Sequence, residues 1–344
     1  MIKLVILIIV YFTFPLVIIF MCKRWTVLKK LGSIVLAYAF GLILGTSGIL
    51  PAGSQNYYLE LRGDPALSGS RMESLLASGT ITEDDVFVNS IRQTQDLLTT
   101  IAIPLAFPLL LFSLNIRKWL KYAKTGFVSM ILAIISILTI IVSGFFIFRD
   151  LVPESWKVAG MLVGVYTGGT PNMASLSYAL DVDPSLFLIT NTYDIVIGAI
   201  TIFFFITVGP RFFRAILPPF KPTGEVVDSE KAVAEAQSFE DFSGLFKKGR
   251  LGPLLKALGI SALISVVSAG IAMLLPKTAF QPAAILLITT LGILASLIPW
   301  INRIEKTFQL GMYFILVFSF AFASMADLKT IFSMGFLGLF GYVM

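Results

Sequence analysis

Long apolar runs separated by short polar segments dominate the chain. A membrane-crossing helix needs about 20 mainly apolar residues. The runs of that kind lie near residues 4–21, 31–49, 98–114, 125–148, 186–209, 254–276, 279–299, 308–325 and 331–344. Most are rich in Leu, Ile, Val and Phe without a polar stripe, which favours lipid contact and helix packing. The pattern therefore predicts an all-α polytopic membrane protein.

One further apolar stretch, residues 158–180, is interrupted by Gly168-Gly169-Thr170-Pro171-Asn172. A broken helix at bilayer depth is tolerated only where it is buried in protein or lines a wet cavity. Many secondary transporters build their substrate and ion sites from such broken helices. The alternative is a Gly-Gly pair that packs closely against a neighbouring helix. Pro171 and Asn172, which follow directly, favour a functional break.

Composition narrows the function classes. The chain is 57% hydrophobic and 13% charged, whereas a soluble domain is roughly 25% charged. The formal charge of +6 comes from basic clusters between apolar runs, which is typical of membrane loops and gives no reason to expect nucleic acid. A single cysteine, Cys22, and the absence of histidine exclude internal disulfides, Ser-His-Asp catalysis and His zinc sites. We expect no enzyme and no cofactor, with Na⁺ as a candidate coupling ion.

Two hydrophilic segments divide the chain. The first, residues 55–96, is acidic, and its Thr82 and Asp85 have capping-box spacing that predicts a short surface helix. The second, residues 211–250, is punctuated by proline and carries mixed charge. The predicted domains are a first membrane repeat (1–210, with the extracytoplasmic insert 55–96), a cytoplasmic linker (211–250) and an incomplete second membrane repeat (251–344).

The basic loops predict the orientation. They contain Lys23, Arg24, Lys29 and Lys30, then Arg117, Lys118, Lys121 and Lys124, and later the ends of the linker. Because basic loops face the cytoplasm, we expect a multi-pass protein of the plasma or inner membrane with its N-terminus outside. The linker is cytoplasmic only if residues 158–180 enter and return on the outer side. This re-entrant interpretation is favoured, and a full crossing stays open.

Two segments suggest an internal repeat. Residues 112–118 and 323–329 each follow a Phe-rich or Leu-rich span, and each leads into a Gly-Phe pair that opens the next span. The second half would start inside where the first starts outside, which makes an inverted-topology repeat. By this spacing the counterpart of Gly168-Gly169 would lie beyond Met344, so we expect the second repeat to be truncated.

Polar residues within the apolar runs are the candidates for chemistry. Asp194 is the foremost, since a carboxylate at bilayer depth costs roughly 2.5–3.5 kcal/mol and could exchange H⁺ for Na⁺. It could instead be an interfacial residue that caps a helix. Neutral side-chain oxygens and freed carbonyls at the break could complete the coordination shell of a Na⁺ ion. A half-helix that starts after Pro171 would direct its first N–H groups at an anionic substrate. The candidate substrate-binding and ion-binding residues are Thr167, Gly168, Gly169, Thr170, Pro171, Asn172, Asn191 and Asp194.

Three stretches carry a family resemblance. They are Tyr166-Thr167-Gly168-Gly169-Thr170-Pro171-Asn172, Leu180-Asp181-Val182-Asp183-Pro184-Ser185 and residues 110–119. In them the chain resembles the membrane proteins of domain-of-unknown-function family 819, which is grouped with cation–proton antiporters and with bile-acid and glutamate symporters of sodium. The resemblance implies an inverted-repeat transporter with two interrupted segments that cross at its centre. It carries over roles only for Gly168, Gly169, Thr170 and Asn172, and the second interrupted segment is absent here.

The sequence thus predicts an ion-coupled secondary transporter, a symporter or antiporter, of a small anionic organic solute. No GxxxxGK[ST] motif is present, so an ion gradient and not ATP would drive it. Two alternatives remain: a non-transporting membrane scaffold or fragment, and an intramembrane aspartyl protease built on Tyr193-Asp194. The protease would need a second intramembrane carboxylate. The expected partners are the lipid bilayer and the solute, with a homodimer left open.

Overall fold

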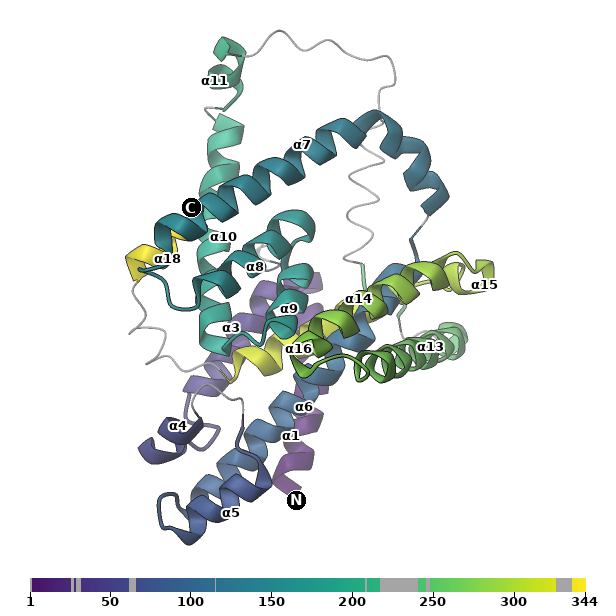
Figure 1. Ribbon diagram of the computed structural model, residues 1–344. Coiled ribbons are helices and arrows are strands. Elements are labelled where there is room, and N and C mark those ends of the chain that lie inside the picture. The colour runs from purple at the N-terminus through teal and green to yellow at the C-terminus, as the bar shows by residue number, and fades with distance from the viewer. Residues whose placement is uncertain are drawn as a thin grey trace.

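A computed structural model describes residues 2–25, 28, 32–61, 66–114, 116–207, 209–216, 241–245, 248–325 and 336–344. All regular structure in these residues is helical (Figure 1). Five helices are long and apolar enough to cross a membrane by length and composition: Lys3–Arg24, Glu83–Phe112, Phe127–Phe148, Gly249–Ala272 and Ala279–Ser296. The predicted class, an all-α polytopic membrane protein, agrees with this.

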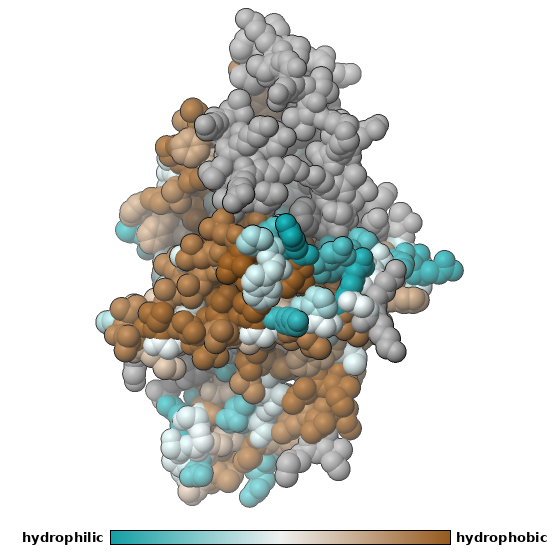
Figure 2. All heavy atoms as spheres, turned by 90° about the vertical axis from the view of Figure 1, so that its right-hand side faces the viewer, coloured by the Kyte–Doolittle hydropathy of each residue, from teal (hydrophilic) through white to brown (hydrophobic). Residues whose placement is uncertain are grey.

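The helices are α1 (Ile2–Arg24), α3 (Ser33–Thr46), α4 (Gln55–Leu61), α5 (Gly69–Ala77), α6 (Glu83–Phe112), α7 (Ile116–Phe148), α8 (Ser155–Gly168), α9 (Thr170–Ala179), α10 (Pro184–Thr207), α11 (Gly209–Ile216), α13 (Lys248–Ala272), α14 (Lys277–Ser296), α15 (Pro299–Asn302), α16 (Thr307–Ala323) and α18 (Phe336–Val343). Seen from the side on which α13 and α15 lie, the surface is hydrophobic over a broad area (Figure 2). Leu263 and Val266 of α13 and Ile140 of α7 are among the exposed apolar side chains. Such a surface is suited to contact with lipid.

Helix α16 lies at the centre of the molecule, and its second half is buried almost without interruption. It runs antiparallel to α6, because Gly311 near its start abuts Ala106 of α6 and Ser324 at its end meets Gln95. It runs alongside α3 in the same direction, where Gly41 lies against the Phe320 carbonyl. Small residues let helix backbones approach closely in membranes. These glycines therefore explain why α16 can pass between its neighbours.

A buried polar cluster joins α1, α6 and α16. The Tyr11 hydroxyl lies 2.7 Å from the Ser324 hydroxyl, and the Gln95 amide donates to both oxygens at 2.8 and 2.9 Å. Ser324 also donates to the Ala321 carbonyl. Because each group in the cluster has a partner, its role is to fix the packing of three helices.

Replacing Gln95 with leucine should destabilise the protein by about 1–2 kcal/mol, since two donated hydrogen bonds are lost in a buried site. The same change at the exposed Gln55 on α4 is the matched control and should leave the melting temperature unchanged. Thermal unfolding in detergent compares the two. Equal melting temperatures for both variants would contradict the structural role of the cluster.

Helix α6 differs from its prediction. The sequence suggested a short surface helix at Thr82 and a separate span at 98–114, but residues 83–112 form one helix of 30 residues, about 45 Å long. The capping-box prediction itself is confirmed, because Asp85 accepts from the Thr82 N–H and hydroxyl at 2.8 and 2.9 Å. The helix continues because buried positions recur at helical spacing and no Gly or Pro intervenes before Pro104. Its first turns therefore belong to the insert.

The insert 55–96 has a small core of its own between α4, α5 and the start of α6. Tyr57, Leu67, Met72 and Val88 are among its buried members. The Tyr57 hydroxyl donates to Asn89 Oδ1 at 2.9 Å, and burial raises the pKa of Tyr57 to about 12, so the phenol remains a donor at neutral pH. The insert is a folded cap over the end of α6.

Asp85 links segments of this cap by hydrogen bonds, so Asp85→Ala should destabilise the cap. Its carboxylate accepts from the Ser54 N–H and hydroxyl at 2.6 and 2.9 Å, in addition to Thr82. Hydrogen bonds to a charged group contribute about 1.5–3 kcal/mol each, and we expect a local loss of about 2–3 kcal/mol. Limited proteolysis between residues 50 and 82 should accelerate. Asp84→Ala, an exposed acid in the same turn, is the control, and equal cleavage rates would contradict this assignment.

The two ends of α6 carry opposite charge. Its start and the insert hold Glu60, Glu73, Glu83, Asp84 and Asp85. At its other end the Asn302 amide donates to the Phe112 and Leu114 carbonyls, both at 2.9 Å. Four basic residues belong to this end of the molecule, two on α13 and two in the connection from α15 to α16: Arg250, Lys256, Arg303 and Lys306. The molecule therefore has an acidic end and a basic end.

Candidate functional site: the interrupted hairpin α8–α9 and helix α10

Helices α8 and α9 form a close antiparallel hairpin (Figure 1). Gly160 of α8 faces Leu180, Gly164 faces Leu176 and the Asn172 backbone, and Gly168 faces the Asn172 side chain. A Cβ at any of the three glycines would overlap these atoms. The interruption is thus a reversal of the chain and not a kink in one continuous helix. This geometry agrees with the re-entrant prediction for residues 158–180.

The reversal is made by Gly169. Its backbone has φ 78° and ψ −172°, a region essentially restricted to glycine. The Gly169 N–H ends α8 by donating to the Val165 carbonyl at 2.7 Å, and its carbonyl starts α9 by accepting from Asn172 and Met173. Pro171 falls in the first turn of α9, where a helix needs no N–H donor. Each residue of the motif therefore has a local structural reason.

The base of the hairpin is fixed by polar contacts. Lys157 donates to the Asp181 carbonyl at 2.7 Å and pairs with Glu154 at 2.8 Å. Helix α10 begins directly afterwards, where Asp183 Oδ1 accepts from the Ser185 N–H at 2.7 Å. The junction Asp181-Val182-Asp183-Pro184-Ser185 is therefore a turn and a helix cap.

The tip of the hairpin and Asp194 lie at similar depths from this base. The 14 residues of α8 and the ten of α9 measure about 21 and 15 Å. Asp194 lies ten residues into α10, or about 15 Å, which is half the thickness of a bilayer core of about 30 Å. Asp194 therefore lies well inside α10 and not at the cap that starts the helix.

Tyr166 connects the hairpin to α18. Its hydroxyl donates to the Val343 carbonyl of α18 at 3.0 Å, and Asp194 of α10 is an electrostatic neighbour of this hydroxyl. A phenol has one proton to donate, and this proton goes to the Val343 carbonyl. Asp194 is half-buried, and no described residue forms an ion pair with it. Its carboxylate is available to a cation.

Asn191 lies one turn before Asp194 on α10, close to the same face of the helix. Its side chain is 2% exposed, and its Oδ1 has no hydrogen-bond partner among the described residues. The buried Tyr38 hydroxyl is also without a partner there, and the Tyr38 ring packs on Phe187, one turn before Asn191. A buried acceptor without a partner calls for a water or an ion. Amide oxygens are ligands of hard cations.

The remaining predicted residues occupy the tip in different ways. The exposed Thr167 turns its hydroxyl back to the Val163 carbonyl at 2.6 Å, so its oxygen serves its own helix. Thr170 opens α9 and is partly buried, and the Asn172 side chain lies against Gly168. The structure describes Pro171 by its backbone alone. The site residue that the sequence did not single out is Tyr166, which adjoins the motif and shows its role only through its approach to α10.

Taken together, the apolar helices define a polytopic membrane protein, and a family model identifies the group. Residues 72–344 match the family described as protein of unknown function (DUF819), and the chain belongs to this family. It is also similar to the uncharacterized membrane protein YjcL of Bacillus subtilis (strain 168), with 24% identity over 250 residues. That match covers 69% of this chain and 61% of YjcL, so the chain spans about three-fifths of its relative. No solved structure matches the chain.

Proposed function

We propose that this protein is a secondary transporter that couples a Na⁺ or H⁺ gradient to the movement of a small anionic organic solute. One observation carries the proposal: on α10 the half-buried Asp194, which has no ion-pair partner among the described residues, lies one turn from the buried, unpartnered oxygen of Asn191. A carboxylate within a membrane span is costly and is a mark of ion pathways.

The chain reversal brings groups that bind a cation and groups that bind an anion to the same site. Asp194 supplies the charge that a cation needs, and Asn191 and Tyr166 add oxygen ligands. The last carbonyls of α8 and the first N–H groups of α9 both lie at the tip around Gly169. Helix C-termini favour cations and N-termini favour anions. Such a tip can hold a coupling ion and an anionic solute side by side.

Inverted-repeat architecture is part of the proposal. The two spans matched by the sequence repeat belong to α6 and α16, and these helices run in opposite directions where they pack. Opposite direction is what an inverted repeat requires of matched elements. Residues 326–335, which contain much of the second repeat segment, lie outside the described residues.

The separation of charge supports an orientation with the N-terminus outside. The basic end formed by Arg250, Lys256, Arg303 and Lys306 would face the cytoplasm. The acidic cap would then face outward. Lys3 at the start of α1 lies over Phe87 near the start of α6, so the N-terminus is on the side of the cap.

The alternatives fit the site less well. A pure scaffold gives no reason for a carboxylate and an unpartnered buried amide at the same depth. An aspartyl protease needs a second carboxylate beside Asp194. The acid weighed for that role, Asp327, lies outside the described residues.

Reconstitution into liposomes tests the proposal. Charge movement is recorded on supported membranes while small carboxylates and organic phosphates are added under an inward Na⁺ gradient, an inward H⁺ gradient, or neither. We expect solute-dependent currents with one gradient and their reversal when the gradient is reversed. Currents that do not change with either gradient, or no transport of any probe, would contradict the proposal.

A further inference from the structure

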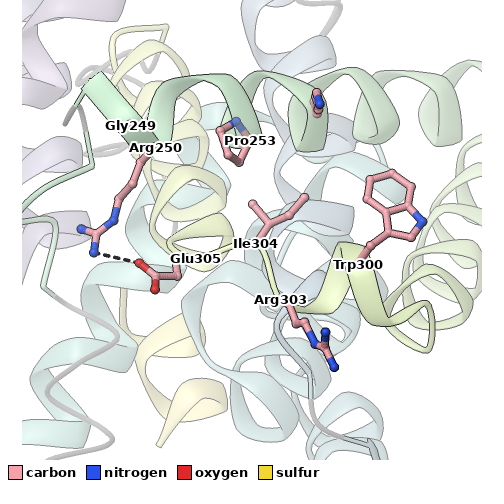
Figure 3. A pocket seen from close by; sticks show the side chains of 8 residues that line it. Gly249, Arg250, Pro253, Trp300, Arg303, Ile304 and Glu305 are labelled. Atoms are coloured by element: carbon pink, nitrogen blue, oxygen red, sulfur yellow. Dashed lines mark ion pairs between the residues drawn. The ribbon is translucent and has the colours of Figure 1, made fainter.

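A second polar site lies at the basic end of the molecule, away from the hairpin. It is a pocket of about 510 Å³ between the first turns of α13, the short helix α15 and the connection from α15 to α16. Figure 3 shows Arg250 and Glu305 at one end, joined by an ion pair, and Trp300 at the other. Pro253 and Ile304 lie between them. The size is that of ordinary small-ligand sites.

The charge of this pocket favours an anion. Arg250, Lys256 and Arg303 line it together with one carboxylate, Glu305. Glu305 is paired with Arg250 at 2.8 Å, whereas no ion pair within the described part of the chain includes Lys256 or Arg303. Two exposed cations are therefore available at the mouth of the pocket. In Figure 3 the Arg303 side chain extends away from α13.

The surroundings of the pocket favour an amphiphile. It lies where α13 begins and α14 ends, which is the level at which apolar helices leave the hydrocarbon. Trp300 is 56% exposed, and exposed tryptophans are typical of the membrane interface. On α13, Leu255 precedes Lys256 in the chain and is 65% exposed, so an apolar side chain adjoins the cation. A phosphate with acyl chains matches this order of groups better than a free anion.

We propose that this pocket binds the phosphate headgroup of an anionic phospholipid. Lys256 and Arg303 provide the positive charge that attracts the phosphate to the pocket, Arg250 is held in place by Glu305 and by the Gly244 carbonyl at 3.4 Å, and the acyl chains lie along α13. Basic pockets between membrane helices are known to take such headgroups. This site is independent of the transport proposal, because it shares no residue with the hairpin.

Native mass spectrometry of the detergent-purified full chain tests this site. Binding of phosphatidylglycerol is compared with phosphatidylcholine in the wild type and in Lys256→Gln/Arg303→Gln. We expect a clear preference for phosphatidylglycerol and a loss of about tenfold or more in the double variant, since each basic residue contributes about 1 kcal/mol near an anionic surface. Glu305→Gln removes the single acid and should strengthen binding.

Lys23→Gln/Arg24→Gln is the matched control, because it removes two exposed cations that do not line the pocket. It should keep the wild-type preference. Equal losses in both double variants would show general attraction to charge and would overturn the pocket. A wild type without preference between the two lipids, with binding of inorganic phosphate alone, would overturn the lipid assignment.

Discussion

Replacing Asp194 with asparagine should abolish the dependence of stability on the coupling ion. An ion that binds the folded protein alone stabilises it by about 2.7 kcal/mol at a concentration 100 times its Kd. Asparagine keeps the shape of the side chain but removes the negative charge that a cation needs. Thermal unfolding in detergent, in NaCl against choline chloride and across pH, measures this dependence. The ion-dependent shift seen in the wild type should vanish.

The controls separate the site from general electrostatics. Asp150→Asn removes an exposed carboxylate beyond the end of α7 and should keep the full shift. Asn191→Ala removes one neutral oxygen and keeps the charge, so it should weaken the apparent ion affinity by about tenfold, equivalent to about 1.4 kcal/mol. If Asp194→Asn retains the wild-type shift, Asp194 is not a ligand and the assigned site is wrong.

Gly169→Ala should disrupt the hairpin with the second largest effect. Alanine at φ 78° and ψ −172° is strained by about 1–3 kcal/mol, and the strain falls on the turn that sets the distance from Tyr166 to α10. We expect a lower melting temperature together with a weaker response to the ion. Gly168→Ala should act on the ion response alone, because its Cβ displaces the Asn172 side chain.

Gly198→Ala on α10 is the matched control, since a Cβ there meets no other heavy atom within 4 Å. Alanine is favoured over glycine in a helix by roughly 0.5–1 kcal/mol, so this variant should be as stable as the wild type or more so. A Gly169→Ala protein with unchanged melting and unchanged ion response would contradict the role of the turn.

The sequence predicted best what depends on neighbouring residues. Apolar run length predicted the five helices that are long enough to span, while the predicted spans 31–49 and 308–325 are the shorter helices Ser33–Thr46 and Thr307–Ala323. Gly168-Gly169-Thr170-Pro171-Asn172 predicted the break, because φ preferences and the missing N–H of proline act locally. Thr82 and Asp85 predicted a helix start correctly. The predicted length of α6 was wrong. Its polar first half has the same helical spacing of buried residues as its apolar second half, so no local signal marks a boundary between them.

What the sequence could not supply is which distant segments meet. Tyr166 and Val343 are 177 positions apart, and their hydrogen bond joins the hairpin to α18. Thr167 stays a predicted ligand, and the structure adds that its hydroxyl donates its proton to the Val163 carbonyl of its own helix. Arg250 and Glu305 are also distant in the chain, and their shared pocket exists only because α13 and α16 begin at the same end of the molecule.

The sidedness of the hairpin flanks tests the central claim most directly. In a Cys22→Ser background, single cysteines at Pro153 and Asp181, both exposed, are labelled with a membrane-impermeant thiol reagent in intact cells and in inverted vesicles. Ser78→Cys in the acidic cap and Lys23→Cys at the end of α1 mark the two faces. A re-entrant hairpin predicts that positions 153 and 181 react from the same face as position 78. Labelling of 153 and 181 from opposite faces would show a full crossing and would contradict the site at the tip.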